Sequence, residues 1–276
     1  MSNQENLYIH VYTTIHSEMI SYKNPDETHE AGQMLLDFIY ADLSKLSYEG
    51  ATPANLDRLR TLHPYFRHIK EDCLKLFFEN SLNTAYEGVF SLKGLIRLQE
   101  TYKEWLFVYV NEGLTQDFIE KAGKFRFYAQ THYIWLNNQP ATDYFLLGFE
   151  DCLYLEFSEM IHYKILIKIC KNCCRMFLPK KSNIDYCPRI YTTDGKTCQD
   201  VGYTQTFARS VKSDELLQAY TRAYKAHYAR MSKPRKRAGN LSREDFEKWY
   251  QEAKEKLKLA RTGVLDADEY KEWLKK

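Results

Sequence analysis

Apolar residues in the first 160 positions of the chain recur mainly at spacings of three and four, which is the period of an amphipathic helix. Thr52 followed by Pro53 predicts the start of one helix, with threonine as the cap and proline in the first turn. Pro64 predicts the start of another. The stripe before Thr52 consists of Met34, Leu35, Phe38, Ile39, Leu43 and Leu46, and the stripe after Pro64 of Phe66, Ile69, Cys73, Leu74 and Phe77.

Further helices are predicted over residues 92–110, 115–134 and 141–162, whereas residues 7–14 alternate in the manner of a short strand. Glycine and proline are sparse, at 11 and 7 residues, which favours long helices with few turns. We therefore expect a mainly α protein in which residues 1–162 form a helical domain with a core of its own.

The pattern changes after this domain. Residues 165–170 and 175–178 are β-prone, flank a cysteine turn and predict a β-hairpin. A helix is expected after Cys198, and Ser213 is the expected cap of a helical stretch that carries the apolar residues Leu216, Leu217, Tyr220, Tyr224 and Tyr228. A cysteine turn on a hairpin, followed by a helix, is typical of treble-clef-like zinc modules. We assign residues 163–231 to such a module.

The end of the chain predicts a separate pair of helices. Residues 232–240 form an expected basic linker. Ser242 and Asp266 each stand three positions before an acidic residue, as helix caps do, and Gly263 lies between them as a terminator. Residues 241–276 therefore predict an αα-hairpin.

Cysteines supply the most specific chemistry. Cys170, Cys173, Cys187 and Cys198 fall within 29 residues, and the first two have the two-residue gap typical of a zinc site. Four thiolates leave no open coordination position, so we expect the zinc to be structural and not catalytic. Cys174 is an alternative to Cys173 if the register of the turn differs.

Ten residues separate Cys187 from Cys198, and the pair Asp194-Gly195 predicts a turn that returns Cys198 to the metal. Cys73 and Cys152 lie in apolar helical contexts and are expected in the core. A disulfide framework is the competing interpretation. It is disfavoured because the start of the sequence lacks a basic segment followed by an apolar run. For the same reason, and because no apolar stretch has membrane-spanning length, we expect a cytoplasmic protein without membrane contact.

Charge is divided unevenly although the net charge is only +2. Residues 1–160 carry 13 Lys and Arg against 23 Asp and Glu, residues 161–240 carry 17 against 5, and residues 241–276 carry 9 against 9, which gives −10, +12 and 0. A zinc ion bound by four thiolates lowers the middle value by about two without changing its sign. This polarity indicates an anionic partner, most often nucleic acid, or docking of the basic segment onto the acidic one.

A zinc-binding, non-enzymatic protein that binds DNA or RNA through phosphate contacts is the first functional hypothesis. The candidate contacts are Arg209, Lys212, Arg222, Lys225, Arg230, Lys233, Arg235, Lys236 and Arg237. Cations near a helix C-terminus also compensate its dipole, and a tyrosine stripe at helical spacing is more often core than a base-stacking surface.

The second hypothesis is a protein-interaction or scaffolding protein in which zinc only stabilises the fold. Catalysis has the weakest support. It rests on Glu150, Asp151, Glu156 and Glu159 along one predicted helix, with no accompanying nucleophile or phosphate-loop motif.

From about Tyr144 onward the chain resembles a family of uncharacterised bacterial proteins of unknown function. The resemblance rests on residues 149–154, 170–173, Phe177, Pro179, 186–189, 195–202 and 219–225. The cysteine module is also similar to zinc fingers with a Cys-Gly-Asn-Arg signature, and this similarity implies DNA binding. Two features depart from that signature: Cys198 is followed by Gln199 and Asp200, and Cys174 stands where such turns usually have glycine.

Overall fold

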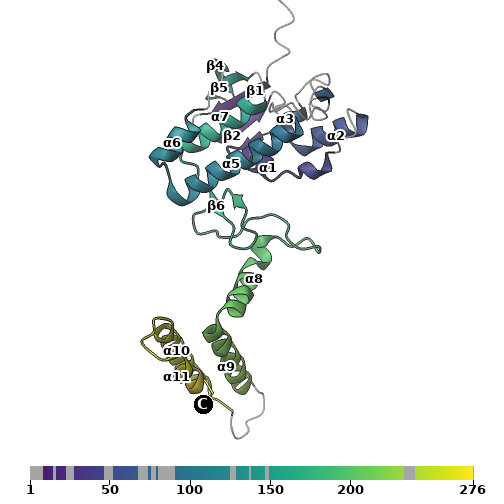
Figure 1. The fold of residues 1–276 in the computed structure, drawn as a ribbon. Helices are drawn as coiled ribbons and strands as arrows, with labels where there is room; N and C mark the ends of the chain where they lie inside the picture. The colour runs from purple at the N-terminus through teal and green to yellow at the C-terminus, as the bar shows by residue number, and fades with distance from the viewer. Residues whose placement is uncertain are drawn as a thin grey trace, which may run out of the picture. The chain divides into compact units, whose positions relative to one another are not determined.

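The computed structural model describes residues 9–14, 17–22, 28–46, 52–67, 74–75, 79, 91–124, 129–136, 138–146, 149–232 and 240–275 of the chain. The protein is mainly helical, as the apolar pattern predicts, and it divides into two compact units (Figure 1). The first unit comprises residues 1–170 and 174–187, and the second comprises residues 171–173 and 188–276.

A five-stranded antiparallel sheet, in the order β3-β2-β1-β5-β4, belongs to the first unit. The strands β1 (Ile9–Thr14), β2 (Ser17–Tyr22) and β3 (Thr28–Glu30) follow one another along the chain. β4 (Ala129–Leu136) and β5 (Gln139–Leu146) form a hairpin that joins the sheet where β5 pairs with β1. β1 confirms the strand expected over residues 7–14.

Two predicted helices are wrong in part because of this sheet. The helix expected over residues 115–134 is replaced by a short helix, α6 (Gln116–Ala122), followed by β4, and the helix expected over residues 141–162 starts only in α7 (Phe149–His162). Threonine, tyrosine, isoleucine and tryptophan in β4 favour extended backbone. Asn138 adopts the left-handed φ of 63° that a tight hairpin requires between the paired ends of the two strands.

The other helices of the first unit agree with the sequence pattern where the structure describes them. They are α1 (Gln33–Ile39), the 3-10 turn η1 (Leu43–Lys45), α2 (Pro53–Leu62), α3 (Pro64–Arg67) and α5 (Leu92–Glu112). Thr52 caps α2, since its Oγ1 accepts a hydrogen bond of 3.3 Å from the N–H of Asn55. Of the stripe expected after Pro64, Phe66 and Leu74 are buried, whereas Ile69, Cys73 and Phe77 lie outside the described residues.

One core holds these helices together. The six apolar residues between Met34 and Leu46 are all buried in it, together with Cys152, as expected. Phe149 of α7 stacks on Phe66 at 4.6 Å between ring centroids and meets the ring of Phe38 edge-on at 5.0 Å. Aromatic pairs of this geometry add to the stabilisation given by burial alone.

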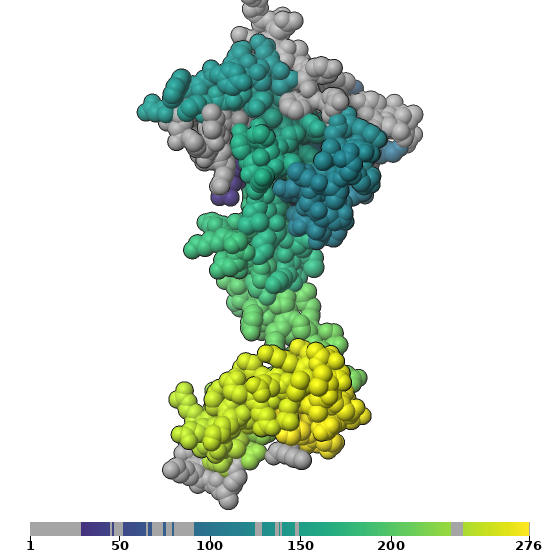
Figure 2. Space-filling view, turned by 90° about the vertical axis from the view of Figure 1, so that its left-hand side faces the viewer, coloured from purple at the N-terminus to yellow at the C-terminus, as the bar shows by residue number. Residues whose placement is uncertain are grey.

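The second unit ends in the predicted αα-hairpin, made of α10 (Arg243–Arg261) and α11 (Ala267–Trp273). Ser242 caps α10 by accepting a hydrogen bond of 3.0 Å from the N–H of Asp245, and Asp266 caps α11. Gly263 has a φ of 75° between the two helices, which fits its expected role as a terminator. Figure 2 shows these two helices as a continuous yellow surface.

Two longer helices precede the hairpin, namely α8 (Cys198–Ser213) and α9 (Glu215–Met231). The residue that caps α9 is Asp214 and not Ser213, because the Asp214 carboxylate accepts a hydrogen bond of 2.9 Å from the N–H of Leu217. Ser213 instead closes α8, with its hydroxyl donating to the carbonyl of Arg209. Unlike a serine hydroxyl, the aspartate carboxylate carries a negative charge, which interacts favourably with the positive end of the helix dipole.

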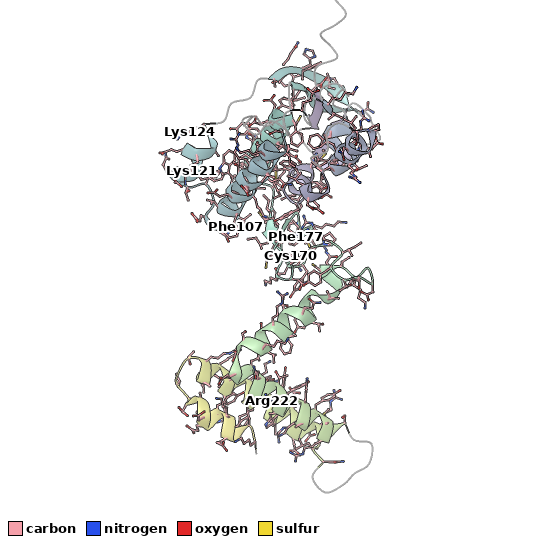
Figure 3. All side chains as sticks on the ribbon, turned by 45° about the vertical axis from the view of Figure 1, so that its right-hand side comes forward. Phe107, Lys121, Lys124, Cys170, Phe177 and Arg222 are labelled. Atoms are coloured by element: carbon pink, nitrogen blue, oxygen red, sulfur yellow. The ribbon has the colours of Figure 1, made fainter. Side chains whose placement is uncertain are left out.

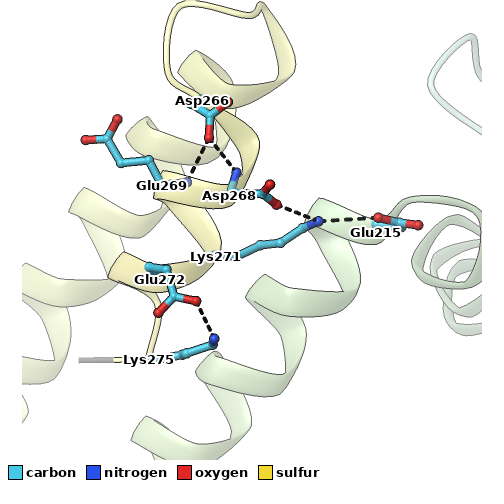
Figure 4. A network of polar contacts seen from close by, with 7 residues as sticks. All are labelled: Glu215, Asp266, Asp268, Glu269, Lys271, Glu272 and Lys275. Carbon is cyan, nitrogen blue, oxygen red and sulfur yellow. Dashed lines mark hydrogen bonds and ion pairs between the residues drawn. The ribbon is translucent and has the colours of Figure 1, made fainter.

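α9 packs along α10 through the tyrosine stripe. The ring of Tyr224 lies 5.6 Å from Phe246 and 5.8 Å from Tyr250, and Tyr220 packs against the core of α10 and α11, whereas Tyr228 is 48% exposed. Lys271 of α11 forms ion pairs of 3.4 Å with Glu215 at the start of α9 and of 3.5 Å with Asp268 (Figure 4).

Candidate metal centre

A short hairpin carries the first two cysteines, as the sequence predicts. β6 (Lys168–Ile169) pairs with β7 (Met176–Phe177). Between them, the N–H of Cys170 donates to the carbonyl of Arg175 and the N–H of Cys174 donates to the carbonyl of Cys170, both at 2.9 Å. Figure 3 labels Cys170 and Phe177 at this hairpin. The backbone bonds fix a tight turn that contains Cys170 and Cys173.

The hairpin is anchored on the core of the first unit. Met176 is buried in that core, and its N–H donates a hydrogen bond of 2.8 Å to the hydroxyl oxygen of Tyr40. The guanidinium of Arg175 lies 5.3 Å from the centre of the same ring, a distance at which a cation is attracted to the aromatic face. Lys168 forms an ion pair of 2.5 Å with Asp185, which lies two residues before Cys187.

The ten-residue interval between Cys187 and Cys198 is closed by a loop, as expected from the Asp194-Gly195 pair. Ile190 and Thr197 form an antiparallel bridge, and Gly195 turns the chain with a φ of 83°. The N–H of Cys198 donates to the carbonyl of Arg189 at 3.0 Å. Thr197 then starts α8 with a capping box that includes Asp200, so Cys198 is the first residue of the helix.

These segments bring four cysteine sulfurs together. The Sγ atoms of Cys170, Cys173, Cys187 and Cys198 all lie within 4.8 Å of one another. A tetrahedral site with Zn–S bonds of about 2.3 Å requires sulfur separations of about 3.8 Å, so a small contraction places a metal ion at bonding distance. Cys173 is half-buried and the other three are buried. The exposed Cys174 is outside this cluster, which favours the register with Cys173.

Hydrogen bonds reach two of the sulfurs. The backbone N–H of Cys187 donates to Sγ of Cys170, and the side-chain amide of Asn172 donates to Sγ of Cys198, both at 3.4 Å. Such donors stabilise the negative charge that a thiolate ligand carries. Soft thiolate donors in a tetrahedral set suit zinc or iron, and they disfavour magnesium and calcium.

Asn172 is a site residue that sequence reasoning missed. Arg209, a predicted nucleic-acid contact, is bound to it: its Nη2 donates to both the side-chain and backbone oxygens of Asn172, at 2.5 Å and 3.0 Å. The position of Asn172 between two predicted ligands was the available signal. Its contact with a residue of α8 could not be read from spacing.

The remaining basic candidates lie on the two helices and on the following segment. Lys212, Arg222 and Lys225 are exposed, and Arg230 is half-buried. Arg222 and Lys225 lie one turn apart on α9 (Figure 3 labels Arg222). The helical period places Arg222 opposite Tyr220 and Tyr224, and it places Lys225 about 100° around the helix from Tyr224. The arm residues Lys233, Arg235, Lys236 and Arg237 lie outside the described residues.

The carboxylates considered for catalysis take part in packing. Glu156 is fully buried, and its Oε1 accepts a hydrogen bond from the backbone N–H of Met34. The hydroxyl of Tyr144 donates to Glu159 at 3.5 Å, and burial raises the pKa of the Glu159 carboxyl. Burial also raises the pKa of Glu150, and the negative charge of Asp151 adds to this effect. The geometry thus gives Glu156 a structural role.

Across the helices that the structure describes, none combines the length and the apolar character needed to cross a membrane.

Comparison with known proteins places a similarity in the second half of the chain, where residues 141–275 match the model of a family of unknown function, DUF6076. No curated protein and no solved structure matches the chain significantly. The matched segment contains residues 141–146 of β5, all four clustered cysteines and every helix from α7 to α11.

Proposed function

We propose that Cys170, Cys173, Cys187 and Cys198 bind one structural zinc ion, and that the basic helices that follow bind nucleic acid through its phosphates. The observation that carries the metal site is the approach of all four sulfurs to within 4.8 Å. Four thiolates occupy every position of a tetrahedral zinc ion, so the ion stabilises the fold and leaves no site for a substrate.

The distribution of charge on α8 and α9 supports the nucleic-acid part of the proposal. The acidic residues of these helices stand at their N-terminal ends, where Asp200 belongs to the capping box and Glu215 pairs with Lys271. Asp214, the cap of α9, pairs with Arg261 at 2.5 Å. Residues 201–213 and 216–231 contain no other Asp or Glu. Their cations are Arg209, Lys212, Arg222, Lys225 and Arg230.

The thiols also bear on the cellular compartment. The proposed zinc site uses four cysteines as ligands. Proteins that keep several thiols reduced are typical of the cytoplasm, and thiolates must stay reduced to hold zinc. We therefore place the protein in a reducing compartment, namely the cytoplasm.

A salt titration of binding tests the proposal. Full-length protein is titrated into fluorescent DNA duplex and single-stranded RNA over a range of salt concentrations, and its zinc content is measured in parallel. Replacing Arg222 and Lys225 together with Gln should reduce the slope of log affinity against log salt by about two, because each phosphate contact contributes about 0.9. The reduction should be similar for unrelated sequences.

A matched control removes the same charge from α10. Lys248 and Lys258 are exposed residues of a helix that carries six Lys and Arg against five Asp and Glu. Their joint replacement with Gln should leave the slope unchanged. Replacing Arg235, Lys236 and Arg237 with Ala should flatten the slope by up to about three if all three contact phosphate. Wild-type protein without salt-sensitive binding to any nucleic acid would overturn this part of the proposal.

A protein-interaction role is the second candidate, and one surface of the first unit favours it. Tyr133 and Trp135 are 88% and 76% exposed on β4, which is an edge strand without charged residues. Exposed edges of this kind are templates for pairing with another chain. Zinc content with no salt-dependent nucleic-acid binding would favour this candidate.

A further inference from the structure

We propose that Asn172 and Arg209 form a positioning pair that holds Cys198 in the geometry for metal binding. The proposal rests on the metal site proposed above and adds two residues outside the ligand set. Asn172 is 3% exposed, and its Nδ2 lies 3.4 Å from Sγ of Cys198. Arg209 binds Asn172 twice, through the side-chain oxygen at 2.5 Å and the backbone oxygen at 3.0 Å.

Arg209 determines which way the amide of Asn172 points. A guanidinium carries only donors, so the side-chain atom of Asn172 that faces Arg209 must be the oxygen. The amino group of the same amide is then directed at the sulfur of Cys198. Without the arginine, the amide could turn its oxygen toward a thiolate, which would place two negatively polarised atoms in contact.

Cys198 and Arg209, the two residues that contact Asn172, both belong to helix α8. Cys198 is the first residue of α8, and Arg209 follows eleven positions later, which is close to three full helical turns. Both residues therefore lie on the same face of the helix. Through Cys198 and Arg209, this face is held at two points by the segment that contains Asn172.

Charge gives the pair a second effect. Four thiolates and one zinc ion carry a net charge of about −2, and this charge is stabilised by donors and cations around the site. The Asn172 amide donates to one sulfur, and the Arg209 guanidinium polarises that amide from its far side. Partners of metal ligands that orient and stabilise them typically change metal affinity by 10- to 100-fold when they are removed.

The rate of zinc transfer from full-length protein to a chromophoric chelator tests the pair. We expect Asn172→Ala and Arg209→Ala each to raise this rate by about tenfold, and Asn172→Asp to raise it further because its carboxylate faces the thiolate. Lys212→Ala, one turn beyond Arg209 and exposed, is the matched control and should leave the rate unchanged. The double variant of Asn172 and Arg209 should be no faster than either single variant, because both residues act through one amide.

A spectroscopic measurement separates this role from general destabilisation. In protein loaded with cobalt in place of zinc, the sulfur-to-metal charge-transfer band should shift in Asn172→Ala, since the sulfur loses its donor, and should stay in place in Lys212→Ala. Arg209→Lys keeps the charge without the planar fork and should shift the band in the same direction. It also serves as the variant of choice if Arg209→Ala fails to fold.

The outcomes distinguish this inference from the proposal on which it rests. Metal-loaded Asn172→Ala with an unchanged transfer rate and an unchanged cobalt spectrum would overturn the positioning role and leave the zinc site intact. Additive effects of the two single variants would overturn their action through one amide. Wild-type protein that binds neither zinc nor cobalt would overturn the metal site itself.

Discussion

Glu156 of α7 accepts a hydrogen bond of 3.0 Å from the backbone N–H of Met34, 122 residues earlier in the chain. Met34 lies at the start of α1, whose N-cap position is occupied by Gly32 with a φ of 86° and no side-chain cap. A Cβ at Gly32 would lie 2.6 Å from the terminal carbon of Met160, so glycine is required there by both backbone and packing. Glu156 thus supplies the acceptor that the helix start lacks.

Removal of this acceptor should destabilise the first unit. Glu156→Ala removes the carboxylate oxygen that accepts the hydrogen bond from the buried N–H of Met34. We expect a loss of about 1–3 kcal/mol in the free energy of unfolding. Glu156→Gln keeps an oxygen acceptor and should cost less. Urea denaturation monitored by tryptophan fluorescence provides the measurement, and the exposed Glu120→Ala is a control expected within about 0.5 kcal/mol of wild type. Equal losses for Ala and Gln would show that the acceptor is not responsible.

His63 should make the stability of the first unit depend on pH. Its Nε2 donates to the carbonyl of Met34 at 2.8 Å among the rings of Phe38, Phe66 and Phe149. Burial lowers the pKa of His63 from 6.5 to about 3. Between these two values the unfolded chain binds a proton that the folded chain does not, so stability falls as the pH falls through 6.5.

The expected loss on going from about pH 7.5 to pH 5 is about 2 kcal/mol for this one group. Denaturation midpoints of wild type and His63→Gln over this range test the expectation, because glutamine keeps an N–H donor but does not titrate. The pH dependence of the variant should be shallower by this amount. Parallel curves for the two proteins would mean that folding does not lower the pKa of His63.

Features that depend on a few neighbouring residues could be predicted from the sequence. The caps at Thr52, Ser242 and Asp266 are encoded within three or four positions, and the structure confirms each of them. The turn at Asp194-Gly195 is local in the same sense. Its closure explains how Cys198 reaches the other sulfurs despite the long interval after Cys187.

Features that depend on distant pairing could not be predicted in this way. β5 pairs with β1, with Tyr144 opposite Val11, and no local pattern specifies that partner. Over short windows, the spacing of apolar residues in β4 and β5 resembles that of the neighbouring helices α6 and α7. The apolar pattern alone therefore did not separate strand from helix. Asn172 and Arg209 are 37 residues apart, and only the folded chain shows that they meet.

Cys174 occupies a position that favours glycine. Its φ of 58° lies in the left-handed region, which costs a residue with a side chain about 1 kcal/mol. Cys174→Gly should therefore retain the metal and stabilise the turn by up to this amount, measured as a slower loss of zinc to a chelator. Cys174→Ser keeps the strained backbone and should behave as wild type. Loss of the metal in Cys174→Ser alone would instead make Cys174 the ligand in place of Cys173.

Metal removal should unfold less of the chain than the sequence pattern predicts. The zinc module assigned from the sequence spans residues 163–231, and a small module held by its metal is expected to unfold as a whole when the zinc is lost. In the structure α9 belongs to a separate core with α10 and α11, which contains Ala253, Leu257 and Tyr270 and no cysteine. The core of the first unit likewise contains none of the four clustered cysteines.

We therefore expect Cys187→Ser, or wild type treated with a strong chelator, to lose order in residues 170–198 and in α8. The helix α9 and the αα-hairpin of α10 and α11 should remain folded. Binding and folding are linked only for the segments that the ion holds. Hydrogen exchange of backbone amides, read by mass spectrometry, should rise sharply in those segments and little in α9, α10 and α11. Cys174→Ser is the matched control and should exchange as wild type. A comparable rise throughout α9 to α11 would mean that the second unit folds only with its metal.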